Sequence, residues 1–208
     1  MTRAANRRKA GILGLLFGRN ADLVTQVKPL FIVCFAGFIF SMGVGWYMGD
    51  SVGDMLNEEL SNMIPDIADM DLISLFIFIV INNAFKNFLW MILGLLGALP
   101  SLYFSFFNGF ILGSVAYTFN AQTNFSVTLA GLLPHGIIEI PTMVLCSAIG
   151  MALGYSLINR LRGKKGLRVK FGKAISLYFR RILPLVVIAA IIEVTITPVF
   201  IALFALTL

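Results

Sequence analysis

The segment LLPHGIIEI, residues 132–140, contains the only histidine of this 208-residue chain and lies in a long apolar stretch. His135 and Glu139 are four residues apart, so on a helix their side chains lie one turn apart on one face. An imidazole and a carboxylate placed in this way can exchange a proton, attract a cation or bind a metal ion. Thr142 and Cys146 continue the same stripe. The chemistry therefore depends on which elements hold these groups and on whether water reaches them.

Other apolar stretches also carry isolated polar residues. INNAFKN, residues 81–87, places three asparagines and Lys86 on a helical arc of about 140°. An ionised side chain at the centre of a bilayer costs roughly 2.5–3.5 kcal/mol on insertion scales, so such groups are expected to meet one another or water. We expect Lys86 to pair with Glu193 or Glu139. The predicted intramembrane polar site consists of Asn82, Asn83, Lys86, Asn87, Asn108, His135, Glu139, Glu193 and Thr197.

The composition identifies the class of protein. Hydrophobic residues make up 59% of the chain and charged residues 12%, whereas a soluble domain has roughly 25% charged residues. Five segments reach the ~20 apolar residues that a membrane-spanning helix needs, namely 29–48, 72–99, 100–119, 135–158 and 182–208. We therefore predict an all-α, polytopic membrane protein with five transmembrane helices. Residues 29–208 form one transmembrane domain, which a basic N-terminal segment of residues 1–28 precedes.

The charges predict the orientation of these spans. Of the 16 Lys and Arg, six lie in residues 1–28 and nine in residues 159–181, whereas seven of the 10 acidic residues lie in residues 50–71. Basic segments tend to stay on the cytoplasmic side. We expect a multi-pass protein of the cell membrane, with its N-terminus in the cytoplasm, the acidic loop outside and the C-terminus outside. The formal charge of +6 is thus a topology signal, and no nucleic-acid-binding motif accompanies it.

Three segments are predicted to deviate from simple spans. The second span has 28 residues, or about 42 Å, so it either tilts or breaks at INNAFKN. Residues 126–136 could form a re-entrant helix that turns at Pro134, His135 and Gly136. The basic segments RRKAGILGLLFGRN and LRVKFGKAISLYFRR are predicted to be two interfacial amphipathic helices that contact anionic lipids.

Small residues at four-residue spacing predict close helix crossings. They occur as Gly37, Ser41 and Gly45, as Gly109 and Gly113, and as Gly150 and Gly154. The spacing is compatible with packing within the chain and with a homodimer. The two cysteines, Cys34 and Cys146, fall inside spans and are predicted to be packing residues without a structural disulfide.

Enzymatic chemistry has little support in the motifs. A metal ion could bind His135 and Glu139, with Glu193 or Cys146 as a third ligand. The chain has no HExxH, no G-x-S-x-G and no Walker sequence, so we predict neither an enzyme nor a cofactor. An intramembrane metal enzyme is the least favoured alternative.

Four segments in order, FIFIVINNAFKN, FNGFILG, LLPHGIIEI and IIEVTITP, resemble the stage II sporulation protein M family over residues 29–198. The family's recurring positions match Asn82, Asn83, Asn108, Gly109, Pro134, His135, Gly136, Glu139, Glu193, Thr197 and Pro198. Pro141 stands where the family often has a small residue. The resemblance implies a non-enzymatic membrane scaffold or assembly subunit that acts with membrane or secreted protein partners.

Two functions follow from these observations. In the first, the protein is a scaffold that recruits or organises partners, its buried polar network fixes the fold, and its acidic loop, residues 50–71, is the external docking surface. In the alternative, it is a small channel or transporter that binds an ion or polar solute among Lys86, His135, Glu139 and Glu193.

Overall fold

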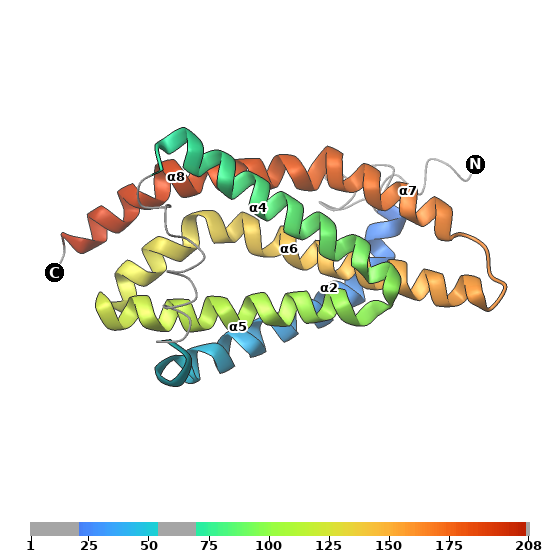
Figure 1. The fold of residues 1–208 in the computed structure, drawn as a ribbon, viewed down its shortest axis with the longest axis horizontal. Coiled ribbons are helices and arrows are strands. Elements are labelled where there is room, and N and C mark those ends of the chain that lie inside the picture. The colour runs from blue at the N-terminus through green and yellow to red at the C-terminus, as the bar shows by residue number, and fades with distance from the viewer. Residues whose placement is uncertain (1–20, 54–69, 207–208) are drawn as a thin grey trace, which may run out of the picture.

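The computed structural model describes residues 21–53 and 70–206, which form helices and connecting turns without a strand. The described part contains five helices long and apolar enough to cross a membrane, as predicted (Figure 1). The main elements are α2 (Ala21–Tyr47), α4 (Leu72–Leu93), α5 (Ala98–Gln122), α6 (Phe125–Leu161), α7 (Leu167–Leu177) and α8 (Leu183–Ala205). The expected N-terminal interfacial helix and most of the acidic loop lie outside the described residues.

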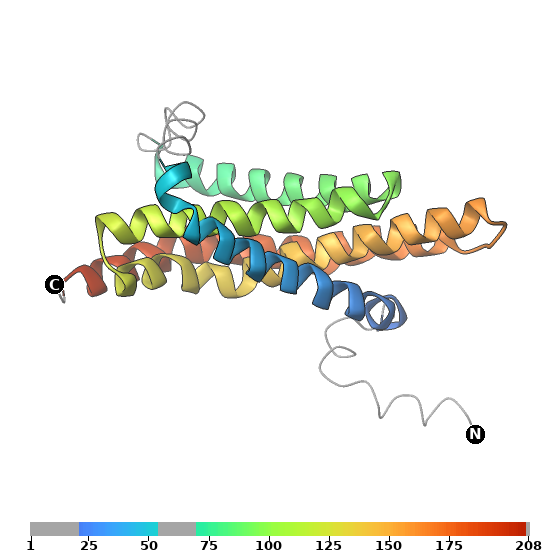
Figure 2. The ribbon, with the colours of Figure 1, turned by 90° about the horizontal axis from the view of Figure 1, so that it is seen from below.

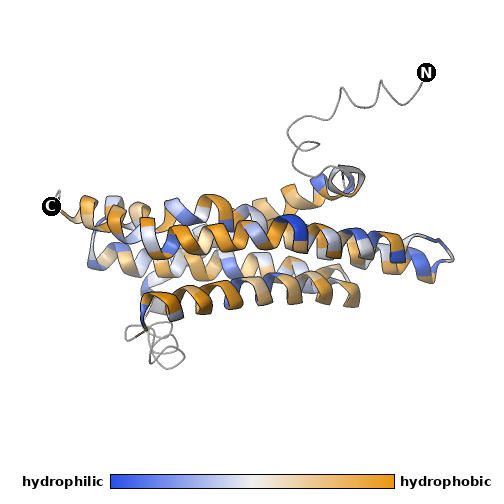
Figure 3. Cartoon of the chain, turned by 90° about the horizontal axis from the view of Figure 1, so that it is seen from above, coloured by the Kyte–Doolittle hydropathy of each residue, from blue (hydrophilic) through white to orange (hydrophobic). Residues whose placement is uncertain are grey.

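The helices run side by side and alternate in direction (Figures 1 and 2). The start of α2, the α4–α5 turn and the α6–α7 turn lie towards one end of the bundle. The start of α4, the α5–α6 turn and the end of α8 lie towards the other. Apolar residues cover most of the helix length, and hydrophilic residues gather near the α6–α7 turn (Figure 3). Among the five spans, α6 is the most buried and α4 the least.

Helix α4 is continuous through INNAFKN, so the second span is not broken there. The Asp71 carboxylate caps its first turn by accepting a hydrogen bond from the Ser74 amide at 2.6 Å, which lowers the pKa of Asp71. Within the helix, Asn82 Nδ2 donates to Asn83 Oδ1 at 3.2 Å, so this amide does not compete for the helix backbone. The extra length of the segment becomes a 3₁₀ turn, Gly94–Leu96, and Gly97 follows at φ 133°. A positive φ there favours glycine and turns the chain into α5.

Helix α6 corrects the expected re-entrant segment. It is one 37-residue helix, capped by Asn124, whose side chain accepts from the Val127 amide at 2.9 Å. Pro134 and Pro141 lie inside it. A proline removes one backbone donor and bends a helix without having to end it. Figure 1 shows α6 bent in its N-terminal half, with the chain continuing in the same overall direction.

Helices α7 and α8 form one long helical segment rather than a separate interfacial helix and a span. A π-helical turn, Tyr178–Ile182, joins them without interruption. The apolar face of α7 buries Ala174 and Leu177, and α7 packs along α6 (Figure 1). Tyr178 fixes this arrangement to α4, because its hydroxyl donates to the Ala84 carbonyl and its ring packs on Phe88 at 5.0 Å. The amphipathic pattern of this segment thus reflects packing against α6.

The small residues at four-residue spacing form helix contacts within the chain. Helices α2 and α5 pack together most extensively, and a Cβ at Gly113 would collide with the Met42 carbonyl of α2. A Cβ at Gly154 would likewise collide with the Gly94 carbonyl at the α4–α5 turn. Ser105 reinforces the α2–α5 crossing by donating to the Cys34 carbonyl at 3.0 Å. Of the two packing modes that the sequence allowed, the intrachain mode accounts for these crossings.

Candidate functional site

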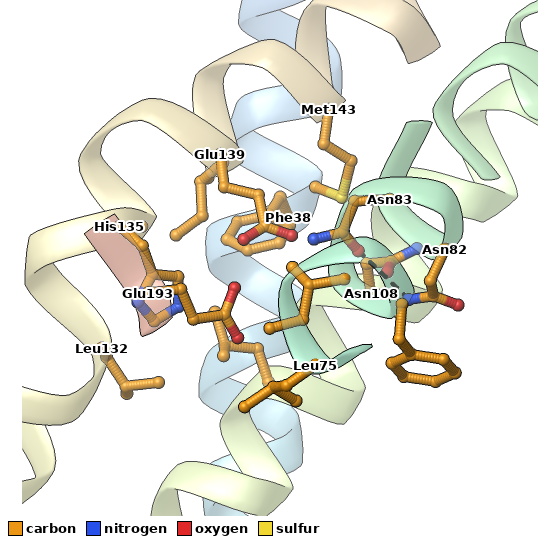
Figure 4. A pocket seen from close by; sticks show the side chains of 15 residues that line it. Phe38, Leu75, Asn82, Asn83, Asn108, Leu132, His135, Glu139, Met143 and Glu193 are labelled. Atoms are coloured by element: carbon orange, nitrogen blue, oxygen red, sulfur yellow. Dashed lines mark hydrogen bonds between the residues drawn. The ribbon is translucent and has the colours of Figure 1, made fainter. Parts of the chain in front are cut away.

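A cavity of about 350 Å³ lies between the helices, and its wall carries most of the predicted polar residues. The polar lining consists of Asn82, Asn83, Asn108, His135, Glu139 and Glu193. The remaining wall is formed by Phe38, Leu75, Phe78, Ile79, Leu112, Leu132, Gly136, Ile140 and Met143. Ionisable groups from α6 and α8 thus face amides from α4 and α5 inside an otherwise apolar region (Figure 4).

His135, Glu139 and Glu193 form a close triad at this cavity. One ligand atom of each residue lies within 4.8 Å of the others, and all three side chains are partly buried. The first two come from successive turns of α6, as their spacing predicted, and Glu193 reaches them from α8. Among the described residues, neither carboxylate accepts a hydrogen bond or forms an ion pair with the protein. The carboxylates therefore remain available to a ligand or to water.

Thr197 orients the histidine. Its hydroxyl donates to the Ile192 carbonyl at 3.3 Å, and His135 Nδ1 lies 3.3 Å from the same hydroxyl oxygen. With the hydroxyl proton directed to Ile192, the oxygen can accept a hydrogen bond from Nδ1–H of the imidazole. In this tautomer Nε2 keeps a lone pair that can take a proton or a metal ion.

The amides stand on the opposite side of the cavity (Figure 4). Asn108 Nδ2 donates to the Phe104 carbonyl of its own helix at 2.7 Å, which leaves Asn108 Oδ1 free to face a donor or a cation. The bond between Asn82 and Asn83 leaves the Asn83 amide hydrogens as donors. This wall can therefore offer both an acceptor and donors to a polar ligand or to its water shell.

The expected ion pair of Lys86 is not formed. Lys86 follows the cavity-facing residues of α4 by one turn, but its side chain is exposed, and the structure gives it no ion pair with Glu139 or Glu193 within 4.0 Å. It remains close enough to interact electrostatically with Glu139. Because α4 is the least buried span, the Lys86 stem extends away from the carboxylates, and its length would let the ammonium reach along the helix towards the membrane interface.

Other predicted positions also lie away from the cavity. Asn87 is buried but does not line it. The stripe of His135 and Glu139 continues into the cavity through Met143, four residues further on, whereas Thr142 and Cys146 turn into the protein core. The spacing of four could have indicated Met143, but no sequence signal marks Phe38 of α2 as a wall residue.

The family's motif residues have distinct positions in the fold. Gly136 lines the cavity, and Gly109 lets α5 approach the Phe38 carbonyl of α2. Pro134 lies beside an apolar groove between α6 and α8, and Pro198 is exposed on α8. These residues shape the helices around the site rather than contribute ligand atoms. Both cysteines are buried and free, and the Cys34 thiol lies 3.3 Å from the Met151 sulfur.

Five apolar helices around a cavity with one imidazole, two carboxylates and three amides define a polytopic membrane protein with an ionisable site in its transmembrane region. Comparison with protein families identifies it further. The family described as Stage II sporulation protein M matches residues 30–198, and the chain belongs to this family.

Two relatives come from Methanocaldococcus jannaschii. The uncharacterized protein MJ0706 is 28% identical over 86% of this chain and 83% of its own length. The uncharacterized protein MJ0793 is 32% identical over 78% of this chain and 88% of its own length. No solved structure matches the chain.

Proposed function

We propose that the protein binds a small cation or polar solute inside the membrane and passes it across, as a transporter or channel. The observation that supports this proposal is the pair of carboxylates, Glu139 and Glu193, that border a cavity and have no hydrogen-bond or ion-pair partner in residues 21–53 and 70–206. A purely structural polar network would be expected to satisfy its groups mutually, because an unpaired carboxylate in a low-dielectric region is costly. A ligand with positive charge would remove that cost.

The size of the cavity favours a small ligand. A water molecule occupies about 30 Å³ of the liquid, so about 350 Å³ accommodates a hydrated ion or a small polar molecule. The polar groups come from four different helices, which would allow small helix movements to open and close the site. The scaffold alternative depends on residues 50–71, most of which lie outside the described residues, and the cavity does not favour it.

Flux through reconstituted protein tests the proposal. The full chain is placed in liposomes, and uptake of H⁺, K⁺ and Zn²⁺ is followed with dyes enclosed in the vesicles. Flux of at least one ion above empty liposomes is expected, and Glu193→Gln and His135→Ala should abolish it. Ser147→Ala is the matched control, since this buried hydroxyl of α6 bonds within its own helix to the Met143 carbonyl and lies away from the cavity.

The melting temperature of each purified variant separates loss of flux from loss of folding. Flux variants that melt like the wild type support the proposal. If the wild type conducts none of the three ions, or if Glu193→Gln unfolds the protein, the network is structural and the proposal is wrong.

A further inference from the structure

We infer that the ligand is a divalent first-row transition-metal ion, such as Zn²⁺ or Mn²⁺, held by His135, Glu139 and Glu193. This inference rests on the proposed function and specifies its substrate. The triad already has a nearly suitable size. Two ligands that each lie about 2.1 Å from a tetrahedral zinc ion are about 3.4 Å apart. Ligand atoms that all lie within 4.8 Å of one another therefore close on one ion if the side chains rotate inward by roughly 1 Å.

The donor set indicates the kind of metal. One imidazole nitrogen and two carboxylate oxygens suit zinc, manganese, iron or cobalt ions. Calcium and magnesium prefer sites made of oxygen alone, and Cu(I) prefers sulfur. The free Cys146 thiol lies outside the triad, so it does not shift the preference towards soft metals.

The charge of the triad points the same way. When both are ionised, the two carboxylates carry two negative charges that a neutral imidazole does not offset, and a dication would bring the group to neutrality. Neutrality matters here because an uncompensated charge within a bilayer is expensive. A monovalent cation would leave one negative charge, and the exposed Lys86 is not paired with either carboxylate.

The surroundings are those of a metal site that exchanges its ion. Thr197 Oγ1 lies 3.3 Å from His135 Nδ1, so a hydrogen bond from Nδ1–H would leave Nε2 as the ligand nitrogen, in the way that outer-shell partners fix metal-binding histidines. Three protein ligands leave at least one position for water or for a second donor, whereas structural sites are closed by four. Asn108 Oδ1 stands across the cavity as an oxygen that could follow the ion as it moves.

The test is a titration of the full chain, purified in detergent and stripped with a chelator, with Co²⁺ as a spectroscopic substitute for zinc. One Co²⁺ per chain should bind with visible d–d absorption, and Zn²⁺ should displace it. Glu139→Gln, Glu193→Gln and His135→Ala should each weaken binding by more than the roughly 10–100-fold that loss of an outer-shell partner costs. Cys146→Ala, the matched control on α6, should leave the affinity unchanged.

A variant that gains a new absorption band on binding Co²⁺ must be folded, so it separates a change of ligand from misfolding. Glu139→Cys replaces an oxygen ligand by sulfur, so its Co²⁺ complex should acquire a thiolate-to-metal charge-transfer band, which Cys146 of the wild type does not give. Absence of Co²⁺ binding to the folded wild type, equal competition by Mg²⁺ or Ca²⁺, or a loss in Cys146→Ala as large as in the triad variants would overturn the inference.

The two proposals fail in different ways. If Co²⁺ and Zn²⁺ do not bind but H⁺ or K⁺ flux depends on Glu193, the metal inference is wrong and the transport function stands. If one metal ion binds tightly but no ion crosses the liposome membrane, the triad is a metal site and the transport function is wrong.

Discussion

At the scale of single residues, the most informative contact of the site is the one between His135 and Thr197. The two side chains come from different helices and meet at 3.3 Å, and Thr197 in turn donates to its own helix. These contacts favour the tautomer of the imidazole that carries its proton on Nδ1. Thr197 is therefore a positioning residue, because it acts on a ligand only through the histidine.

Thr197→Val should test this role. Valine keeps the shape of threonine but cannot accept the Nδ1–H bond, so the Co²⁺ affinity of the purified chain should fall by roughly 10–100-fold. Thr197→Ser should restore the affinity, since serine keeps the hydroxyl. Thr195→Val is the control, because Thr195 is exposed on α8, donates to the Ile191 carbonyl and does not line the cavity. Equal affinities in Thr197→Val and Thr195→Val would show that the histidine does not depend on Thr197.

Residue types and spacing were sufficient to predict much of the candidate site. Polar residues within apolar spans stand out, and the helical period placed His135 and Glu139 on one face of α6. The sequence could not show where the cavity ends. Lys86 belongs to the same face of α4 as Asn82, yet it extends away from the carboxylates, because its direction depends on neighbouring helices. Met143 was missed because its apolar side chain does not stand out in an apolar span, although its spacing of four from Glu139 placed it on the same face of α6.

At the scale of helices, the close crossing of α2 and α5 supports the wall that Phe38 and Asn108 contribute to the cavity. Glycines bring the two backbones together, and hydroxyls such as Ser114, which donates to the Gly45 carbonyl at 3.1 Å, bond across the contact. Between helices in lipid, such packing takes the place of a hydrophobic driving force. A single methyl group added at this crossing should therefore lower the free energy of unfolding.

Gly113→Ala should destabilise the protein by roughly 1–3 kcal/mol, the usual effect of overpacking a tight contact. The added Cβ meets the Met42 carbonyl and lies 2.9 Å from the Trp46 amide nitrogen, and backbone atoms cannot rotate away. Gly43→Ala is the control, because a Cβ there meets nothing within 4 Å. Thermal unfolding of both variants in the same detergent measures the difference. Similar melting temperatures for both variants would mean that α2 and α5 are not tightly packed in solution.

The number and type of helices were predictable because the length of an apolar run is set by the thickness of the bilayer. Their continuity was harder to predict. A proline or an amphipathic stretch suggests an end, but neighbouring helices decide whether the chain bends or breaks. The segment around Pro134 stays helical within α6, and residues 167–177 continue into α8 because their apolar face packs on α6.

At the scale of the whole molecule, the bundle has two unlike ends. Helix α6 has 37 residues, or about 55 Å at 1.5 Å per residue, so it is longer than the ~30 Å of hydrocarbon. Its C-terminal part and α7 extend past the α4–α5 turn (Figure 2). Arg160, Arg162, Lys164 and Lys165 lie at or beside the α6–α7 turn, at the end of the bundle where α2 begins. From the positive-inside tendency we expect this end to face the cytoplasm.

Cysteine labelling tests the orientation. In a chain carrying Cys34→Ala and Cys146→Ala, single cysteines are introduced by Lys165→Cys at the α6–α7 turn or Gln122→Cys at the α5–α6 turn, both exposed positions. A membrane-impermeant maleimide added to intact cells should label Gln122→Cys, whereas Lys165→Cys should react only after permeabilisation. The chain without cysteines is the control for background. Labelling of Lys165→Cys in intact cells would reverse the topology and place the basic extension outside. The two turns lie at opposite ends of the bundle. That result would therefore also show that positive charge does not determine the orientation of this protein.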